Sequence, residues 1–213
     1  MNIKTAIREY KDEANFFAPD YEQENETLTK FKSAHPTISN SEIETFKEIL
    51  TTSNDWEEKF FVADLLYLYP SFDTVLLDPL VENAISYSDP SFNRIFLRPC
   101  MKVFGVQLVS DILAEKFASA DIVRKISISS LVYWLERNDN HQIKNLEDAI
   151  VDRSNKTDNI IELYHYNRYF PDKVALLKRI PHDAEELINY IKGDPELEDL
   201  LFNKLGWQKM NGS

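Results

Sequence analysis

The sequence predicts an all-α protein, and three observations support this fold class. The chain of 213 residues contains only four glycines, where an average usage of about 7% would give about fifteen. Beyond residue 40, apolar residues recur at helical spacing, and capping residues or prolines stand between the helical segments. With 43% hydrophobic residues, the chain can bury a core either as one large domain or as an elongated array.

The N-terminal part is expected to cover one end of this core. Residues 1–38 can form two comparatively polar helices, which would cap the first buried helix pair. Ser41, followed three residues later by Glu44, resembles a capping box at the start of the next helix. Apolar residues from Ile43 to Leu50 then share one helical face, which predicts the first amphipathic helix of the core.

The segment 55–69 is predicted to be an interior helix. Asn54 can serve as its N-cap with Glu57 at the third helical position, and Pro70 ends it. Residues 60–69 are apolar except for Asp64, which fits a helix buried over most of its circumference. A buried strand is the alternative, but the run has a helix start and a proline stop. A membrane-docking face is disfavoured because the flanking charges are acidic.

Short helices are expected to follow one another to the end of the chain. They are predicted over 73–87, 91–104, 106–118, 121–137, 141–153 and 157–170. Shorter helices over 172–180, 183–191 and 195–207 would form a C-terminal cap within 171–213. In that cap, Gly193 and Gly206 are placed as helix stops and Pro195 as a helix start.

The helices repeat at a nearly constant interval. Aligning the second helix of each pair places Leu80, Leu113 and Leu146 in equivalent positions, 33 residues apart. With the helix-pair length, the short turns at 88–90 and 119–121 and the proline at position 99, residues 40–170 resemble HEAT-like repeats of the armadillo-type α-solenoid family. The arginine that often follows an aspartate-containing turn in that family is missing here.

The resemblance implies an architecture for the whole chain. We expect a single domain over 1–213, built as a right-handed α-α superhelix of HEAT-like helix pairs with helical caps at both ends. In such arrays the second helices line the concave surface. Solenoids of this kind commonly bind partners along that surface, although fold by itself does not fix function.

Carrying the 33-residue register to polar positions aligns acidic residues. One row contains Glu82, Glu115 and Asp148, and a second contains Asp78 and Asp111, with Lys144 at its third position. By the resemblance, these carboxylates would form a negative stripe that attracts a basic partner. The alternative is that they are ordinary solvated residues of an acidic protein.

Residues 162–170 combine aromatic side chains with an arginine. Tyr164, Tyr166 and Arg168 are candidate partner-binding residues, because tyrosine and arginine are typical of interface hot spots. The same composition is also typical of a core where the repeats meet the C-terminal cap, which is the interpretation we favour.

No pattern in the sequence indicates catalysis. Glu162 and His165 have the Glu-x-x-His spacing of di-iron bundles, but that site needs a second copy, and no other histidine has a glutamate three residues before it. Cys100, the single cysteine, lies in an apolar segment and is interpreted as a buried thiol in a reducing compartment. Glycine-rich phosphate loops and serine elbows do not occur. We therefore expect no enzymatic activity, cofactor or metal.

The charge balance restricts the partners. With 36 acidic against 24 basic residues and a net charge of -12, a phosphate-rich partner is disfavoured. No apolar stretch of about 18 residues predicts membrane insertion, so we expect a cytoplasmic protein. The leading hypothesis is a non-enzymatic module that binds a basic protein partner through an acidic concave face.

Two further interpretations stay open. In size, charge and helix pattern the chain is similar to bacterial immunity proteins that neutralise toxins, often cationic nucleases. An alternative from another class is a HEAT-like alkylpurine DNA glycosylase, in which Trp134 and Asp111 would take the aromatic and acidic roles. The acidic charge argues against that activity, because the family binds DNA in a basic groove.

Overall fold

The computed structural model describes residues 2–13, 25–87, 90–136, 140–174 and 180–207. These residues form twelve α-helices, two short 3-10 helices and one short π-helix, and no strand occurs among them. The all-α prediction is confirmed for these residues. The chain divides into two compact units, Met1–Ala84 with Arg94–Gly105 and Ile85–Asn93 with Val106–Ser213.

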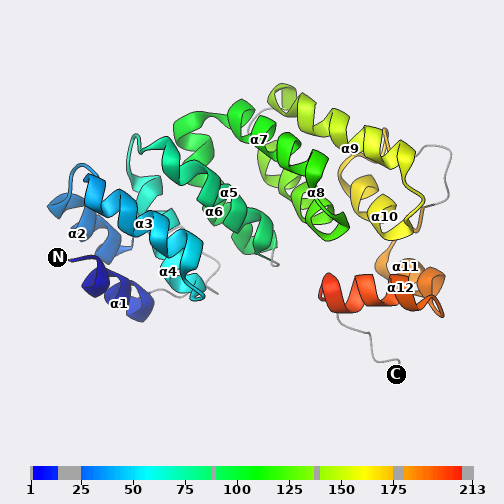
Figure 1. Cartoon of the computed structure of the whole chain (residues 1–213), viewed down its shortest axis with the longest axis horizontal. Helices are drawn as coiled ribbons and strands as arrows, with labels where there is room; N and C mark the ends of the chain where they lie inside the picture. Colours follow the sequence, from blue (N-terminus) through cyan, green and yellow to red (C-terminus); the bar gives the residue numbers. More distant parts are fainter. Residues whose placement is uncertain (1, 14–24, 88–89, 137–139, 175–179, 208–213) are drawn as a thin grey trace. The chain divides into compact units, whose positions relative to one another are not determined.

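Four helices open the first unit, drawn in blue and cyan in Figure 1. They are α1 (Ile3–Glu13), α2 (Glu26–Ala34), α3 (Asn40–Thr52) and α4 (Trp56–Leu68). The helix α4 contacts all three of the others, and α1 also contacts α2. The two helices expected in the N-terminal part are therefore present, although residues 14–24 between them lie outside the described residues.

The apolar run of α4 forms the centre of this unit. Its buried side chains are Phe60, Phe61, Val62, Ala63, Leu65 and Leu66. The ring of Phe61 makes edge contacts with Tyr10 of α1 and Phe31 of α2, at centroid distances of 5.5 and 6.1 Å. Because buried residues cover most of the helix circumference, the prediction of an interior helix is confirmed, and the strand alternative is wrong.

The capping box of α3 lies two residues before its predicted position. Ser39 is the N-cap: the Glu42 backbone N–H donates to Ser39 Oγ at 3.4 Å, and the Ser39 N–H donates to Glu42 Oε2 at 2.7 Å. The pair Ser41 and Glu44 has the same spacing, so the motif occurs twice in overlapping registers. The register found in the structure buries Glu42 and places its Oε1 2.8 Å from Nδ1 of His35.

The next two helix starts use aspartates. Asp55, one residue after the predicted Asn54, caps α4 by accepting from the Glu57 backbone N–H at 2.9 Å. Asp73, the first residue of the helix predicted over 73–87, accepts from Val75 N–H at 2.9 Å. It precedes the 3-10 helix Thr74–Leu76, which is followed by α5 (Leu77–Ser86) and α6 (Pro90–Phe104). The helix α6 contains Pro99 in its interior, as expected.

Three of the long-range hydrogen bonds in the first unit have similar sequence separations, whereas others span 36, 44 and 54 residues. Each of the three joins a side chain to a backbone carbonyl 33 to 35 residues earlier in the chain. They run from Asn83 Nδ2 to Leu50 O (2.8 Å), from Tyr69 Oη to His35 O (2.6 Å) and from Lys102 Nζ to Tyr67 O (2.5 Å). Successive helix pairs are therefore in contact at a spacing close to the 33-residue register.

The second unit contains two layers of helices, drawn in green and yellow in Figure 1. They are α7 (Val106–Ser119), α8 (Ile122–Glu136), α9 (Lys144–Lys156) and α10 (Ile160–Tyr169). In addition to the pairs α7–α8 and α9–α10, the helix α7 packs on α9, and α8 packs on α10. Leu113 and Leu146, aligned by the repeat register, are fully buried, as is Leu80 in the first unit.

The C-terminal helices complete the second unit. They are α11 (Ala184–Ile191), α12 (Pro195–Glu198) and the π-helix Asp199–Lys204. Pro195 begins α12 as predicted, and Gly206 has a φ of 71°, which favours glycine. A core cluster joins Ile126 of α8 and Ile161 of α10 to Leu187 and Leu201 of this cap. Of the helix predicted over 172–180, residues 175–179 lie outside the described residues.

None of the described helices combines the length and the apolar composition needed to cross a bilayer.

Candidate functional site

The predicted acidic residues lie on three helices. Asp78 and Glu82 are on α5, Asp111 and Glu115 are on α7, and Asp148 is on α9. Asp78, Glu115 and Asp148 are exposed, while Glu82 and Asp111 are partly buried. Because α7 packs on α9, the structure brings the last three of these residues onto neighbouring helices of the second unit.

A hydrogen bond connects the two acidic helices of the second unit. The side-chain amide of Asn145 on α9 donates to Asp111 Oδ1 on α7 at 2.7 Å, across 34 residues of sequence. Gln107 donates to the same carboxylate at 3.0 and 3.1 Å. Lys144 lies 3.0 Å from Asp148 and offsets part of its charge. Glu115 forms no hydrogen bond or ion pair with another described residue, so its charge is open to solvent.

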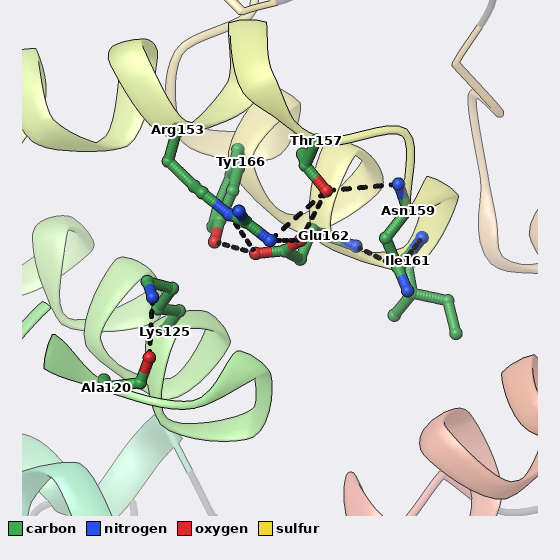
Figure 2. A network of polar contacts seen from close by, with 8 residues as sticks. All are labelled: Ala120, Lys125, Arg153, Thr157, Asn159, Ile161, Glu162 and Tyr166. Atoms are coloured by element: carbon green, nitrogen blue, oxygen red, sulfur yellow. Dashed lines mark hydrogen bonds and ion pairs between the residues drawn. The ribbon is translucent and has the colours of Figure 1, made fainter. Parts of the chain in front are cut away.

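Glu162 is the centre of a buried polar network, shown in Figure 2. Its side chain is fully buried, and Arg153 binds it through Nε to Oε1 at 3.0 Å and Nη2 to Oε2 at 2.7 Å. The hydroxyls of Thr157 and Tyr166 donate to the two carboxylate oxygens at 2.6 and 2.8 Å. Four hydrogen bonds therefore satisfy this carboxylate, and it serves to join α9 to α10.

The pKa of Glu162 reflects opposing effects. Burial raises it, but hydrogen bonds from Arg153, Thr157 and Tyr166 outweigh burial and hold the pKa below its usual value. The same burial, together with the neighbouring carboxylate, raises the pKa of the Tyr166 hydroxyl. Both groups therefore keep fixed protonation states near neutral pH, as expected for a structural network.

The three candidate residues of the segment 162–170 have different environments. Tyr166 is fully buried and belongs to the network around Glu162. Tyr164 is partly buried, with its ring 6.0 Å from that of Trp207 in the C-terminal cap. Arg168 is exposed and lines a cavity. The core interpretation accordingly describes Tyr166 and Tyr164, and Arg168 alone is open to a partner.

A cavity of about 950 Å³ lies in the second unit, between α8, α10 and the end of the C-terminal cap. Ligand sites typically have volumes of roughly 300–1,000 Å³. Its aromatic walls are Tyr87, Tyr133, Trp134, Tyr169 and Trp207. Arg168 and Lys204 also line it, and no aspartate or glutamate does so among the described residues.

His165 lines the same cavity from α10. Its Nε2 atom is buried and has no hydrogen-bond partner among the described residues, which costs about 1–3 kcal/mol for a neutral polar group. Burial and the nearby Arg168 lower its pKa to about 4, so the imidazole is neutral at physiological pH. The ring lies 5.8 Å from that of Trp207.

The residues considered for a metal site or for a nucleophile lie in separate environments. Glu162 and His165, considered for a metal, have different surroundings. The glutamate is bound by Arg153, whereas the histidine belongs to the cavity lining. No group of three or more potential ligating side chains occurs within the described ranges. Burial raises the pKa of Cys100, whose thiol donates to Phe96 O at 3.3 Å, so its nucleophilic thiolate is disfavoured.

Trp134 and Asp111, considered for a glycosylase, are also in different environments. Trp134 lines the cavity, and its Nε1–H donates to Asn93 Oδ1 at 2.9 Å. Asp111 is on α7, accepts a hydrogen bond from Asn145, and does not line the cavity. The structure therefore does not bring these two side chains together in the cavity.

Most of the cavity could not be identified from the sequence, because its lining comes from four separate parts of the chain. Of the lining residues, Arg168 was predicted as a partner-binding residue, and His165 and Trp134 were considered only for a metal and for a glycosylase. The adjacent aromatics Tyr133 and Trp134, with ring centroids 4.8 Å apart, are a local signal, but nothing in the sequence pairs them with Trp207.

No family model, no curated protein and no solved structure matches this chain.

Proposed function

We propose that this chain is a non-enzymatic, HEAT-like helix-pair protein that binds a basic protein partner through the acidic face of α7 and α9. The observation that carries the proposal is the hydrogen bond from Asn145 to Asp111, 34 residues apart. It supports the repeat register used to align the acidic residues, and it fixes one carboxylate of that alignment at the contact of two helices.

Further contacts support the helix-pair array. Three hydrogen bonds of the first unit join groups 33 to 35 residues apart, and the second unit has α7 on α9 and α8 on α10. A stack of helix pairs produces contacts of this kind, because each element touches its equivalent in the next pair. One continuous superhelix over residues 40–170 within a single domain stays part of the proposal.

Charge is the basis for choosing a basic partner. Glu115 and Asp148 are exposed on neighbouring helices, and Glu115 has no cation bound to it among the described residues. Asp78 and Glu82 provide a corresponding pair on α5 of the first unit. In a chain of net charge -12, such carboxylates speed encounter with a cationic protein and pair with its lysines or arginines. A cationic nuclease toxin neutralised in the cytoplasm is the narrower form of the proposal.

The proposal is tested by reversing the two exposed charges together, as Glu115→Lys with Asp148→Lys. Asp111 is left unchanged because its hydrogen bond joins α7 to α9. The matched control is Asp172→Lys with Glu185→Lys, two exposed acids outside these helices, which changes the net charge equally. Immobilised wild-type, test and control proteins are compared by pull-down from native lysate at two salt concentrations, with mass spectrometry.

We expect one basic protein that is retained by the wild type and the control, is lost from the test variant, and dissociates as salt rises. Equal retention by the test and control variants would show that the acidic face of α7 and α9 does not bind the partner. Circular dichroism of both variants checks that the helix content is unchanged.

A further inference from the structure

The charged side chains that line the cavity of the second unit are opposite in sign to the net charge of the chain. The protein carries net charge -12, yet the described residues that line the cavity include Arg168 and Lys204 and no carboxylate. Lys204 is 3.0 Å from Asp199. Arg168 forms no hydrogen bond or ion pair with another described residue, so its planar array of donors is open to a ligand.

The aromatic side chains that line the cavity favour a ligand with a flat ring. Trp134 and Tyr133 come from α8, Tyr169 comes from α10, and Trp207 follows the C-terminal π-helix. Aromatic rings presented from several elements favour a planar apolar guest, which they contact by stacking or edge-to-face packing. A cationic guest would also be attracted by aromatic faces, but Arg168 and Lys204 repel it.

His165 also lines the cavity. Its Nε2 atom has no hydrogen-bond partner among the described residues, but this atom is buried and therefore does not belong to the surface that a guest would contact.

From the cationic and the aromatic lining of the cavity we infer that it binds a small planar aromatic anion. The ring occupies the space between the tryptophan and tyrosine side chains. The carboxylate, or an equivalent anionic group, pairs with Arg168, which suits it because the guanidinium forms two parallel hydrogen bonds with such groups. This inference does not depend on the proposed protein partner.

Three probes of the same shape and different charge test the inference: 2-naphthoate, 2-naphthamide and 2-naphthylmethylammonium. Affinities are measured by calorimetry on the full chain. Binding is located by NMR of the three tryptophan indoles, because Trp134 and Trp207 line the cavity and Trp56 lies in the first unit. We expect naphthoate to bind most tightly and to shift the indole signals of Trp134 and Trp207 while leaving that of Trp56 unchanged.

Variants assign the anion contact. Arg168→Gln is expected to weaken naphthoate about tenfold and to leave naphthamide unchanged, because it removes a charge-assisted contact. Arg124→Gln is the matched control, since Arg124 is on α8 and does not line the cavity. Lys204→Gln is a second test, at the other cation of the cavity.

The inference is overturned if naphthoate binds no more tightly than naphthamide, or if Arg168→Gln and Arg124→Gln behave alike. It is also overturned if the Trp56 signal moves with the other two. The reversal at Glu115 and Asp148 should leave naphthoate binding intact, and Arg168→Gln should leave the basic protein bound. Failure of one proposal is therefore distinguishable from failure of the other.

Discussion

Arg153 and Glu162 form an ion pair whose two partners differ in exposure. The glutamate side chain is fully buried, whereas the arginine side chain is 36% exposed. Removing the arginine would leave a buried charge with only two hydroxyl donors, and such a charge is far more costly than the loss of a surface pair. The network therefore stabilises the junction of α9 and α10 only while all its members are present.

We expect Arg153→Met to lower the free energy of unfolding by about 3 kcal/mol or more. Adding Glu162→Gln should restore part of the loss, because the buried group is then neutral. Urea denaturation measures both. Lys156→Met is the control, since Lys156 pairs with Asp152 in an exposed i,i+4 contact, and it should have little effect. A cost for Arg153→Met equal to that of the control would contradict a structural role for the network.

His165 makes stability depend on pH in a defined window. Its pKa is lowered from 6.5 to about 4 in the folded protein. Between these values the unfolded chain binds a proton that the folded chain does not, so the contribution is lost as pH falls from 6.5 toward 4. Above pH 6.5 the histidine is neutral in both states, and its contribution does not change.

The corresponding prediction concerns His165→Phe. The difference in unfolding free energy between the wild type and this variant should be constant above pH 7 and should fall between pH 6.5 and 5, because only the wild type carries the histidine. Urea titrations at several pH values measure the difference. A difference that stays constant down to pH 5 would show that His165 titrates normally in the folded state.

At the scale of single elements, the start of α3 shows how local signals can be degenerate. Ser39 with Glu42, and Ser41 with Glu44, have identical spacing, and both precede the same apolar face. The structure uses the first pair, in which Glu42 is also held beside His35. The capping motif alone does not decide between the two starts, and the start found in the structure is the one in which Glu42 also contacts His35.

Two alanine variants distinguish the registers. Ser39→Ala is expected to destabilise the protein by about 1 kcal/mol, because it removes the acceptor for the Glu42 backbone N–H. Ser41→Ala should change stability much less, since Ser41 is exposed and lies inside the helix. Thermal or urea unfolding compares the pair. A larger cost at Ser41 would show that the helix begins at the predicted serine.

At the scale of the whole molecule, two features of opposite sign lie in the second unit. Exposed acids occupy α7 and α9, while the cavity lined by α8 and α10 carries Arg168 and Lys204. Partner binding at the acids should weaken as salt rises, because exposed charges are screened. The aromatic part of the cavity gains its affinity from apolar contact, which salt does not screen.

The sequence alone determined the all-α class, the order and approximate limits of the described helices, and the interior position of α4. These features follow from local patterns: caps, prolines and apolar periodicity act within a few residues of the chain. The equivalence of Leu80, Leu113 and Leu146, all of them buried, could be found from the sequence for the same reason, because a repeat is recognised by comparing one local pattern with the next.

Only the tertiary structure decided which polar groups meet. It joined Arg153 to Glu162, placed Tyr166 in the core beside them, and brought Asn145 to Asp111. It also assembled the cavity from Tyr87, α8, α10 and Trp207, which are up to 120 residues apart in the sequence. The physical reason is that a helix face is fixed by spacing along the chain. The neighbour of a side chain on another helix depends on how the helices pack, and no local pattern encodes that packing.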